Sequence, residues 1–339
     1  MNSSDSRTGV HEFLRRQGLL RAGEYAELTP LTGGVSSDLW KADLPTRTVC
    51  VKRALAQLEV AHEWLAPVSR NQVEYDWLRF AAQVCPGHVP RVIAHDAEVG
   101  LFAMEFLPPE RYPVWKAELL GGNVDVTAAR AVGDLVGRLH SASAADSRSA
   151  LRFDTDDNFD ALRIEPFLRF TGETHSDLRE RFTELARTTT STHLAVVHGD
   201  VSPKNILLGP DGPVLLDAEC AWFGDPAFDV AFCLNHLLIK SVKLPRHAAD
   251  LRAAAQTLAE AHARHIDWES PTAFGKRVTA LLPALALARI DGMSPVEYLD
   301  TAQRREVRKV GRALLADPAP AVDQLLDRWA MAGSLPSGT

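Results

Sequence analysis

The residues with the clearest chemical potential lie between positions 198 and 219 of this chain. Asp200 follows a short apolar stretch, and Asn205 comes five residues later. Two further apolar stretches come next, separated by the turn-forming residues 209–212 (GPDG), and the second leads directly into Asp217. This pattern predicts a loop followed by a β-hairpin, which would return Asp217 to the neighbourhood of Asp200 and Asn205.

Two carboxylates and an amide at this spacing suit the transfer of a phosphoryl group. Asp200 would orient a hydroxyl and accept its proton, while Asn205 and Asp217 would hold Mg²⁺ on the phosphates of a nucleotide. Mg²⁺ prefers hard oxygen ligands and binds few protein groups. An HGD turn or an acidic strand end alone is usually structural, so the prediction depends on their ordered combination.

This segment resembles the catalytic and metal loops of the aminoglycoside phosphotransferase and choline kinase group, a small-molecule branch of the protein-kinase-like fold. Gly199 and Ser202 stand where protein kinases usually carry Arg and Lys, and Asp217-Ala218-Glu219 replaces Asp-Phe-Gly. The resemblance implies an α+β, bilobal fold with a small antiparallel β-sheet and a helix in the N-terminal lobe and a larger, mainly α-helical C-terminal lobe. We expect these lobes at residues 1–106 and 107–332, and a disordered tail at 333–339.

In the N-terminal lobe, Lys52 lies on a predicted strand, Thr48–Arg53, that alternates apolar and polar residues. By the resemblance it would hold the α- and β-phosphates of ATP, with GTP as the alternative nucleotide. Such a lysine needs a carboxylate partner. Glu74, on a helix predicted at 71–82, is the preferred one, and Asp76 and Glu63 compete with it.

Two other segments would contact the nucleotide. The small residues between two predicted strands allow backbone amides to approach a phosphate, as in the nucleotide loop of the family; the relevant residues are Gly34, Ser36 and Ser37. The strand at 100–106 runs into Pro108-Pro109, which marks a joint between lobes. By the resemblance, the backbone of Glu105 and Leu107 would bind adenine there.

The region between Lys52 and the helix resembles 5-methylthioribose kinases in part. It carries a tryptophan and then an arginine directly before the helix, within the segment 59–71, whose role is open. The Asp217–Glu219 pair agrees with that group, whereas Ser202-Pro203-Lys204-Asn205 departs from it. The resemblance therefore indicates the superfamily and leaves the acceptor open.

Outside these motifs the pattern is mainly helical. Val10, Phe13 and Leu14 predict an amphipathic helix within residues 9–21, and the pattern predicts four more in the C-terminal lobe, at 126–142, 176–192, 247–265 and 272–289. Ser294 to Glu297 has the spacing of a capping box and predicts another helix start. The Asp-rich segment 151–170 predicts a loop, either solvated or inserted near the substrate.

Supporting roles follow for four polar residues. By the resemblance, Asp229 would orient the catalytic loop. His198 and His140 would pack as structural residues, and Lys204 is either a surface charge or a contributor near the γ-phosphate.

The acceptor would be a small molecule with a hydroxyl group, such as a metabolite, sugar or antibiotic. Candidate residues for its binding are Glu219, Trp222, Asp225, Arg289 and Asp291.

Composition limits the remaining possibilities. The 339-residue chain has a net charge of −7 and 46% hydrophobic residues, which favours neither nucleic acid nor an anionic membrane as a partner. The start lacks an apolar signal core, and the four cysteines have no metal-binding spacing, so we expect a cytoplasmic protein, as a monomer or homodimer. A small-molecule kinase is the preferred function. A protein kinase-like enzyme and a catalytically silent nucleotide-binding scaffold are the alternatives.

Overall fold

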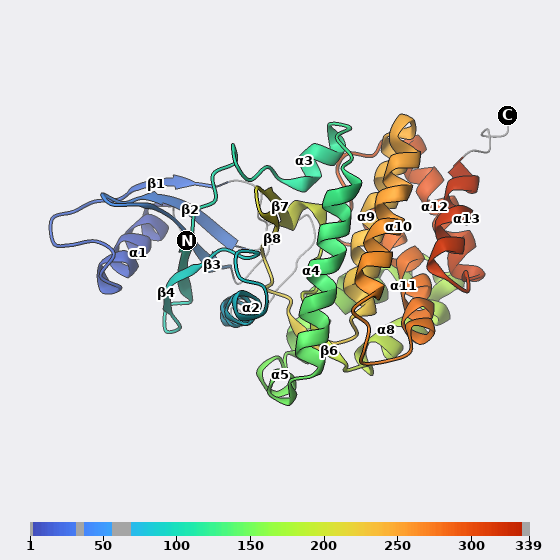
Figure 1. Ribbon diagram of the computed structural model, residues 1–339, viewed down its shortest axis with the longest axis horizontal. Helices are drawn as coiled ribbons and strands as arrows, with labels where there is room; N and C mark the ends of the chain where they lie inside the picture. The colour runs from blue at the N-terminus through green and yellow to red at the C-terminus, as the bar shows by residue number, and fades with distance from the viewer. Residues whose placement is uncertain (1–2, 32–36, 56–68, 334–339) are drawn as a thin grey trace.

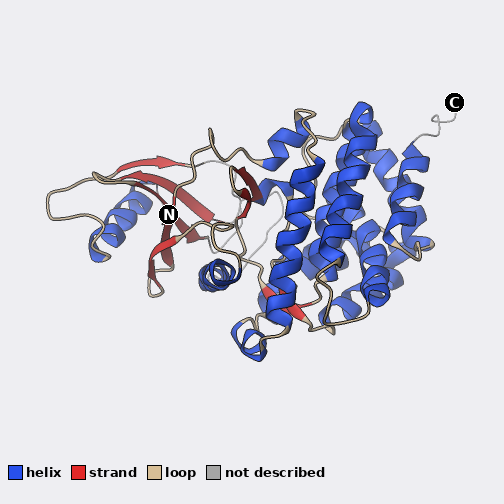
Figure 2. Cartoon of the chain, in the orientation of Figure 1, coloured by secondary structure: helices blue, strands red, loops and turns tan. Residues whose placement is uncertain are grey.

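The computed structural model describes residues 3–31, 37–55 and 69–333, and it shows two unequal lobes (Figure 1). A β-sheet with helix α1, Ser3–Arg16, forms the smaller lobe, and helices make up most of the larger one (Figure 2). This architecture confirms the bilobal α+β fold. The lobe boundary at residue 106 stays a prediction, and residues 334–339 lie outside the described part.

The sheet of the smaller lobe is antiparallel, with strand order β1-β2-β3-β5-β4. Its strands are β1 Glu27–Pro30, β2 Ser37–Asp43, β3 Thr48–Ala54, β4 Val92–Asp96 and β5 Leu101–Glu105. Alternation along β3 sends Val49 and Val51 into a cluster with Phe13 of α1, while Cys50 joins the larger core on the opposite face. Lys52 follows on that second face, which helix α2 covers.

Helix α2, Arg70–Val84, begins one residue earlier and ends two residues later than the predicted 71–82. Its apolar side carries Trp77, Leu78 and Phe80, which are buried in the larger core. Glu74 is buried as well, since it lies on the side of the helix that faces β3. The packing of α2 therefore brings a carboxylate under the sheet.

The larger lobe consists of packed helices around α4, α9 and α10 (Figure 1). A Cβ atom at Gly133 of α4 would lie 2.2 Å from the backbone oxygen of Leu258 in α10, so glycine is what allows the two helices to approach so closely. The main helices are α3 Trp115–Leu120, α4 Val126–Ala144, α8 Arg179–Thr190, α9 Ala227–Lys243, α10 Ala248–Ala263, α11 Pro271–Asp291, α12 Thr301–Ala316 and α13 Val322–Gly333.

Two short β-ribbons carry the chemically interesting loops. Strand β6, Ala195–Val197, pairs with β9, Trp222–Gly224, and strand β7, Ile206–Gly209, pairs with β8, Gly212–Leu215. The β7–β8 pair is the hairpin that the sequence predicted. One 3₁₀ turn, Pro203–Asn205, connects the loop after β6 to this hairpin.

The prediction of a loop at 151–170 is wrong. After α5, Ser147–Arg152, the chain forms a nearly continuous helical run of α6 Asp156–Phe159, the π-helix η1 Asp160–Arg169 and α7 Phe170–Thr174. Phe159, Leu162 and Phe167 are buried on one side of this run. The widened π-helical turn accommodates Pro166, whose missing N–H and ring would otherwise break an α-helix.

The helix start expected at Ser294 is also wrong. Residues 292–300 form a non-helical connection, and α12 begins after Asp300, whose side chain accepts a hydrogen bond from the Gln303 N–H in a capping box. The connection is fixed by the burial of Val296 and Leu299 rather than by helix formation.

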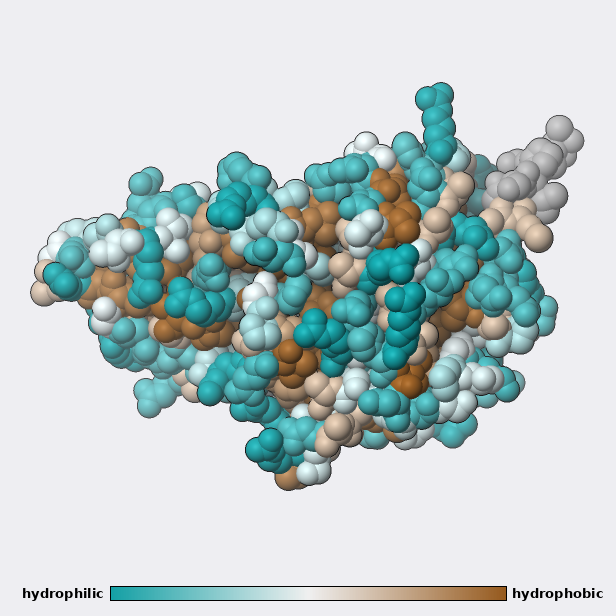
Figure 3. Space-filling view, in the orientation of Figure 1, coloured by the Kyte–Doolittle hydropathy of each residue, from teal (hydrophilic) through white to brown (hydrophobic). Residues whose placement is uncertain are grey.

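No helix among the described residues is long and apolar enough to cross a membrane. The face of the molecule in Figure 3 is mostly hydrophilic, with hydrophobic residues in separate small areas. The free cysteines at 50, 85, 220 and 233 are all buried.

Candidate active site

The loop after β6 is held in place by hydrogen bonds from its backbone amides to one buried carboxylate. Asp229, fully buried in α9, accepts hydrogen bonds from the His198 N–H at 2.7 Å and the Gly199 N–H at 2.8 Å. Gly199 has φ of +79°, and a Cβ atom there would lie 2.7 Å from the Cys220 oxygen, which excludes other residues. His140 contacts the same carboxylate at 3.1 Å. The predicted positioning role of Asp229 is therefore confirmed.

His198 packs beneath this loop, as the sequence indicated. Its Nε2 donates to the Leu216 oxygen at 3.1 Å, and its Nδ1 accepts the Asp200 N–H at 3.2 Å. The ring packs edge-on against Trp77 of α2, with 4.7 Å between ring centres. Burial lowers the pKa of His198. Both ring nitrogens are committed to the backbone, so the imidazole supports the loop and is not available as a base.

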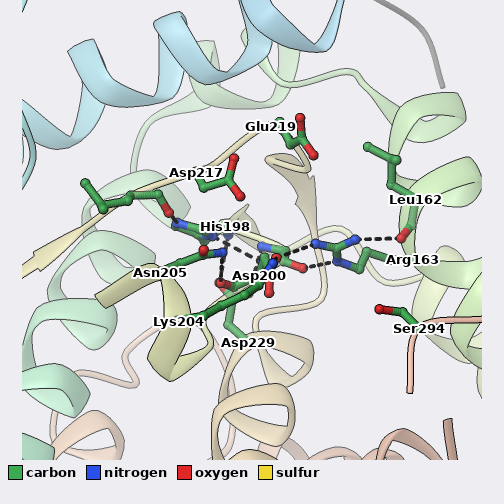
Figure 4. A network of polar contacts seen from close by, with 12 residues as sticks. Leu162, Arg163, His198, Asp200, Lys204, Asn205, Asp217, Glu219, Asp229 and Ser294 are labelled. Carbon is green, nitrogen blue, oxygen red and sulfur yellow. Dashed lines mark hydrogen bonds and ion pairs between the residues drawn. The ribbon is translucent and has the colours of Figure 1, made fainter. Parts of the chain in front are cut away.

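Asp200 is 5% exposed and lies between two cations (Figure 4). Its Oδ2 is 2.9 Å from Arg163 Nη2 and 3.1 Å from Lys204 Nζ. Burial alone would raise the pKa of Asp200, but Lys204 and Arg163 more than offset it and hold the pKa below its usual range. The carboxylate is therefore ionised at neutral pH and can accept a proton or a hydrogen bond.

Arg163 was not identified from the sequence. It comes from η1, is buried, and also donates from Nε to the Gly199 oxygen and from Nη1 to the Leu162 oxygen at 2.6 Å. The spacing of Phe159, Leu162 and Phe167 was the available signal that residues around Arg163 form a buried helix. The many aspartates before it concealed that signal.

Lys52 binds two carboxylates from separate parts of the chain. Its Nζ is 2.6 Å from Glu74 Oε2 and also pairs with Asp217 Oδ1. Burial would lower the pKa of Lys52, but Asp217 and Glu74 raise it, so the ammonium stays charged. Burial also raises the pKa of Glu74, to about 7. The expected Lys52–Glu74 pair is present. Asp76 instead contacts Gln72 at 2.9 Å, and Glu63 lies outside the described residues.

Asn205 and Asp217 present oxygen atoms beside Asp200 (Figure 4). Asn205 donates from Nδ2 to the backbone oxygen of Asp200 at 3.2 Å, which leaves Asn205 Oδ1 as an acceptor. Asp217 follows β8 with φ of +65°, a backbone conformation that non-glycine residues rarely adopt and that often marks a functional position. Its Oδ1 binds Lys52, so Oδ2 remains for a cation. These hard oxygen donors fit Mg²⁺.

The structure places the other predicted nucleotide contacts as follows. Glu105 ends β5 with its side chain exposed, and its N–H donates to the Arg91 oxygen at 2.9 Å. Leu107 follows in the connection to the larger lobe. Ser37 begins β2 and is buried. Gly34 and Ser36 lie outside the described residues.

The predicted substrate residues separate into two groups. Glu219 lies beside Asp217 (Figure 4) and accepts a hydrogen bond from Arg70 Nε at 3.0 Å. Arg289 is close enough to Asp200 for the charge of that carboxylate to affect its pKa. The others are structural, which corrects their assignment. Trp222 is buried against Phe159, with 4.3 Å between ring centres.

Asp225 and Asp291 are likewise engaged away from the catalytic loop. Asp225 is fully buried, pairs with Arg277 at 2.9 Å and accepts the Ala227 N–H at the start of α9. Asp291 pairs with Arg308 at 2.6 Å and with His175 at 3.0 Å. Both carboxylates therefore join elements of the larger lobe.

Comparison with known proteins decides the family. A model described as "Phosphotransferase enzyme family" matches residues 27–247, which is more than half of the chain. The chain belongs to the phosphotransferase enzyme family. Among curated relatives, this phosphotransferase is 25% identical to the methylthioribose kinase of Yersinia pseudotuberculosis serotype O:3 (strain YPIII), over 82% of each chain.

Solved structures agree with the fold of this phosphotransferase. The amicoumacin kinase hAmiN has a TM-score of 0.57 at 14% identity, over 93% of this chain and 96% of that one. A choline/ethanolamine kinase family protein from Mesorhizobium loti has a TM-score of 0.51 at 17% identity, over 98% and 99% of the two chains. This phosphotransferase is a small-molecule kinase with a hydroxyl acceptor.

Proposed function

We propose that the protein transfers the γ-phosphoryl group of ATP, with Mg²⁺, to a hydroxyl group of a small metabolite. The observation that supports this most strongly is the convergence of Lys52, from β3, with Asp200, Asn205 and Asp217, from the loops around the β7–β8 hairpin. Phosphoryl transfer needs alignment and charge stabilisation rather than covalent help from the protein. These residues can supply both.

Each group has a defined task in this proposal. Asp200, kept ionised by Arg163 and Lys204, orients the acceptor hydroxyl and takes its proton. Lys52 holds the nucleotide phosphates, and Glu74 keeps its ammonium in place. Asn205 and Asp217 would hold Mg²⁺, which supplies positive charge against the charge that develops on the transferred group.

The nucleotide would lie between the lobes. The backbone of Glu105 and Leu107 is our assignment for adenine, and Gly34, Ser36 and Ser37 for the phosphates. GTP is the alternative nucleotide, so nucleotide preference enters the test below.

The charges near Asp200 also bear on the acceptor. Lys204 and Arg163 lower the pKa of Asp200, and the charge of Asp200 in turn acts on Arg289. A polycationic acceptor such as an aminoglycoside would be repelled by these side chains. A neutral or acidic small molecule suits the site better.

The test is label transfer from γ-labelled ATP or GTP with Mg²⁺ to a fractionated metabolite pool, for the wild type and for Asp200→Asn. We expect a labelled small molecule from the wild type and a loss of about a thousandfold or more in kcat for the variant, with nucleotide affinity retained. Asp211→Asn, the same chemical change at an exposed residue of the β7–β8 turn, is the matched control. Failure of the wild type to bind nucleotide with Mg²⁺ would refute the proposal.

A further inference from the structure

Two cations on the acceptor side of the site, the buried Lys240 and the partly buried Arg289, have no carboxylate partner among the described residues. Lys240 of α9 is 1% exposed, and its Nζ donates only to the His236 oxygen, at 3.4 Å. Arg289, near the end of α11, donates to Ser294 Oγ at 3.0 Å. Buried charges in proteins are normally paired, so these two need an explanation.

The nearby carboxylates are already engaged. Asp200 binds Arg163 and Lys204, and the exposed Glu297 binds Lys116 at 2.5 Å. Figure 4 shows Asp200 between its cations, with Ser294, the partner of Arg289, on the side of Arg163. An excess of positive charge therefore remains at Arg289 and Lys240.

Unpaired polar atoms accompany these cations. Arg289 Nε, His236 Nε2 and the Tyr298 hydroxyl are buried and have no hydrogen-bond partner among the described residues. His236 is 5% exposed, so its ring is not solvated. An unmade hydrogen bond at a buried polar atom destabilises the folded protein. Such a group of unpaired polar atoms is typical of a site that a ligand completes.

The side chains that carry these polar atoms lie close to one another. Lys240 Nζ is 5.2 Å from the centre of the Tyr298 ring. Arg289 and Lys240 both act on His236, whose pKa is lowered well below its usual range, by burial first and then by these cations. Asp200 contributes to the electrostatic environment of both His236 and Arg289. The donors therefore border the position where the acceptor hydroxyl must meet Asp200.

We propose that the acceptor is a small hydroxy acid, whose anionic group binds Arg289 and Lys240 while its hydroxyl faces Asp200. This inference rests on the proposed function. The acid group neutralises these two cations and receives hydrogen bonds from Arg289 and the Tyr298 hydroxyl. In the transfer itself, the bond from the γ-phosphorus to the bridging oxygen breaks, a bond from phosphorus to the acceptor oxygen forms, and the hydroxyl proton moves to Asp200. The acid group is unchanged.

The test uses pairs of compounds that differ in charge: gluconate and glucose, glycerate and glycerol, and 4-hydroxybutyrate and 1-butanol. Binding is measured by titration calorimetry on the full chain with Mg·ADP at constant ionic strength, and phosphoryl transfer is measured with Mg·ATP. We expect the acid of at least one pair to bind about tenfold or more tightly than its neutral partner.

Variants assign that preference to residues. Arg289→Gln and Lys240→Met should each reduce the affinity for the acid about tenfold while leaving the affinity for Mg·ADP unchanged. Arg246→Gln and Lys309→Met remove the same charges at exposed positions and should keep the preference. The inference is wrong if no acid binds better than its neutral partner, or if both site variants retain the preference.

The two proposals can fail separately. Asp200-dependent transfer to neutral compounds alone would keep the kinase function and overturn the hydroxy-acid acceptor. Acid binding that depends on Arg289 and Lys240, without any Asp200-dependent transfer, would support the anion site and count against the kinase function.

Discussion

Replacing Lys240 with methionine should stabilise the protein at neutral pH. Lys240 is buried, and no carboxylate pairs with it among the described residues. Burial first, and then Lys116 and Arg289, lower the pKa of Lys240 to about 7. Methionine has a similar length and flexibility and carries no charge, so it fills the space without the cost of a buried cation.

The size and the pH dependence of this effect follow from the pKa. In the unfolded chain the lysine has its ordinary pKa of 10.5. Below about pH 7 both states are protonated, and the native cation costs at most about 5 kcal/mol, at 1.36 kcal/mol per pH unit. Between pH 7 and 10.5 the unfolded state binds more protons than the native state. The wild-type free energy of unfolding therefore rises with pH in this interval, and the advantage of the variant shrinks to about 1 kcal/mol at pH 9.5.

The assay is urea unfolding at pH 6, 7.5 and 9.5, followed by tryptophan fluorescence and circular dichroism. Lys309→Met, at an exposed position of α12, is the control and should leave the free energy of unfolding unchanged within about 0.5 kcal/mol. If Lys240→Met is no more stable than the wild type at pH 6, or if its advantage does not decline with pH, the lysine is not an uncompensated buried cation. The account of the anion site would then lose its basis.

Three further substitutions test the supporting contacts. Glu74→Gln removes one carboxylate from Lys52 and should weaken Mg·ATP binding about tenfold in titration calorimetry, whereas Asp76→Asn on the same helix should not. Arg163→Gln removes a cation from Asp200, so the pKa of this carboxyl should rise and the acid limb of the pH profile of kcat/KM should move to higher pH. Asp229→Ala removes the acceptor of two backbone amides and should lower the free energy of unfolding by about 3 kcal/mol, with a parallel loss in kcat; Asp229→Asn should lie between it and the wild type.

Each of these predictions has a contrary outcome. Equal nucleotide affinity for Glu74→Gln and the wild type would mean that the Lys52–Glu74 pair does not contribute to nucleotide binding. An unmoved acid limb with reduced kcat in Arg163→Gln would show that the arginine positions the loop without tuning the carboxyl. Full stability of Asp229→Ala would mean that water replaces its hydrogen bonds.

The sequence predicted best those features that depend on neighbouring residues. The β7–β8 hairpin follows from apolar stretches around a GPDG turn, and the position of Lys52 follows from strand alternation. Glu74 was identifiable because α2 has a clear apolar side, which fixes the direction of the remaining residues.

Contacts between distant segments were harder to predict. Arg163 pairs with Asp200 and donates to the Gly199 oxygen, 36 positions away along the chain, from a helix that the sequence pattern did not indicate. Trp222 and Asp225, which follow Asp217 closely in the sequence, were candidates for substrate binding. In the structure β9 pairs with β6, and both side chains are buried in the larger lobe. Closeness in sequence to a catalytic loop does not specify the direction of a side chain.

Helix α2 connects Lys52, our proposed phosphate-binding residue, with the segment that follows Asp217. Glu74 binds Lys52, while Arg70, one turn earlier on the same helix, binds Glu219, two residues beyond Asp217. A ligand that holds Lys52 in place therefore also favours the helix position in which Arg70 holds Glu219. We expect positive cooperativity between the nucleotide and the acceptor. Because such coupling is reciprocal, the nucleotide should increase acceptor affinity by the same factor as the acceptor increases nucleotide affinity.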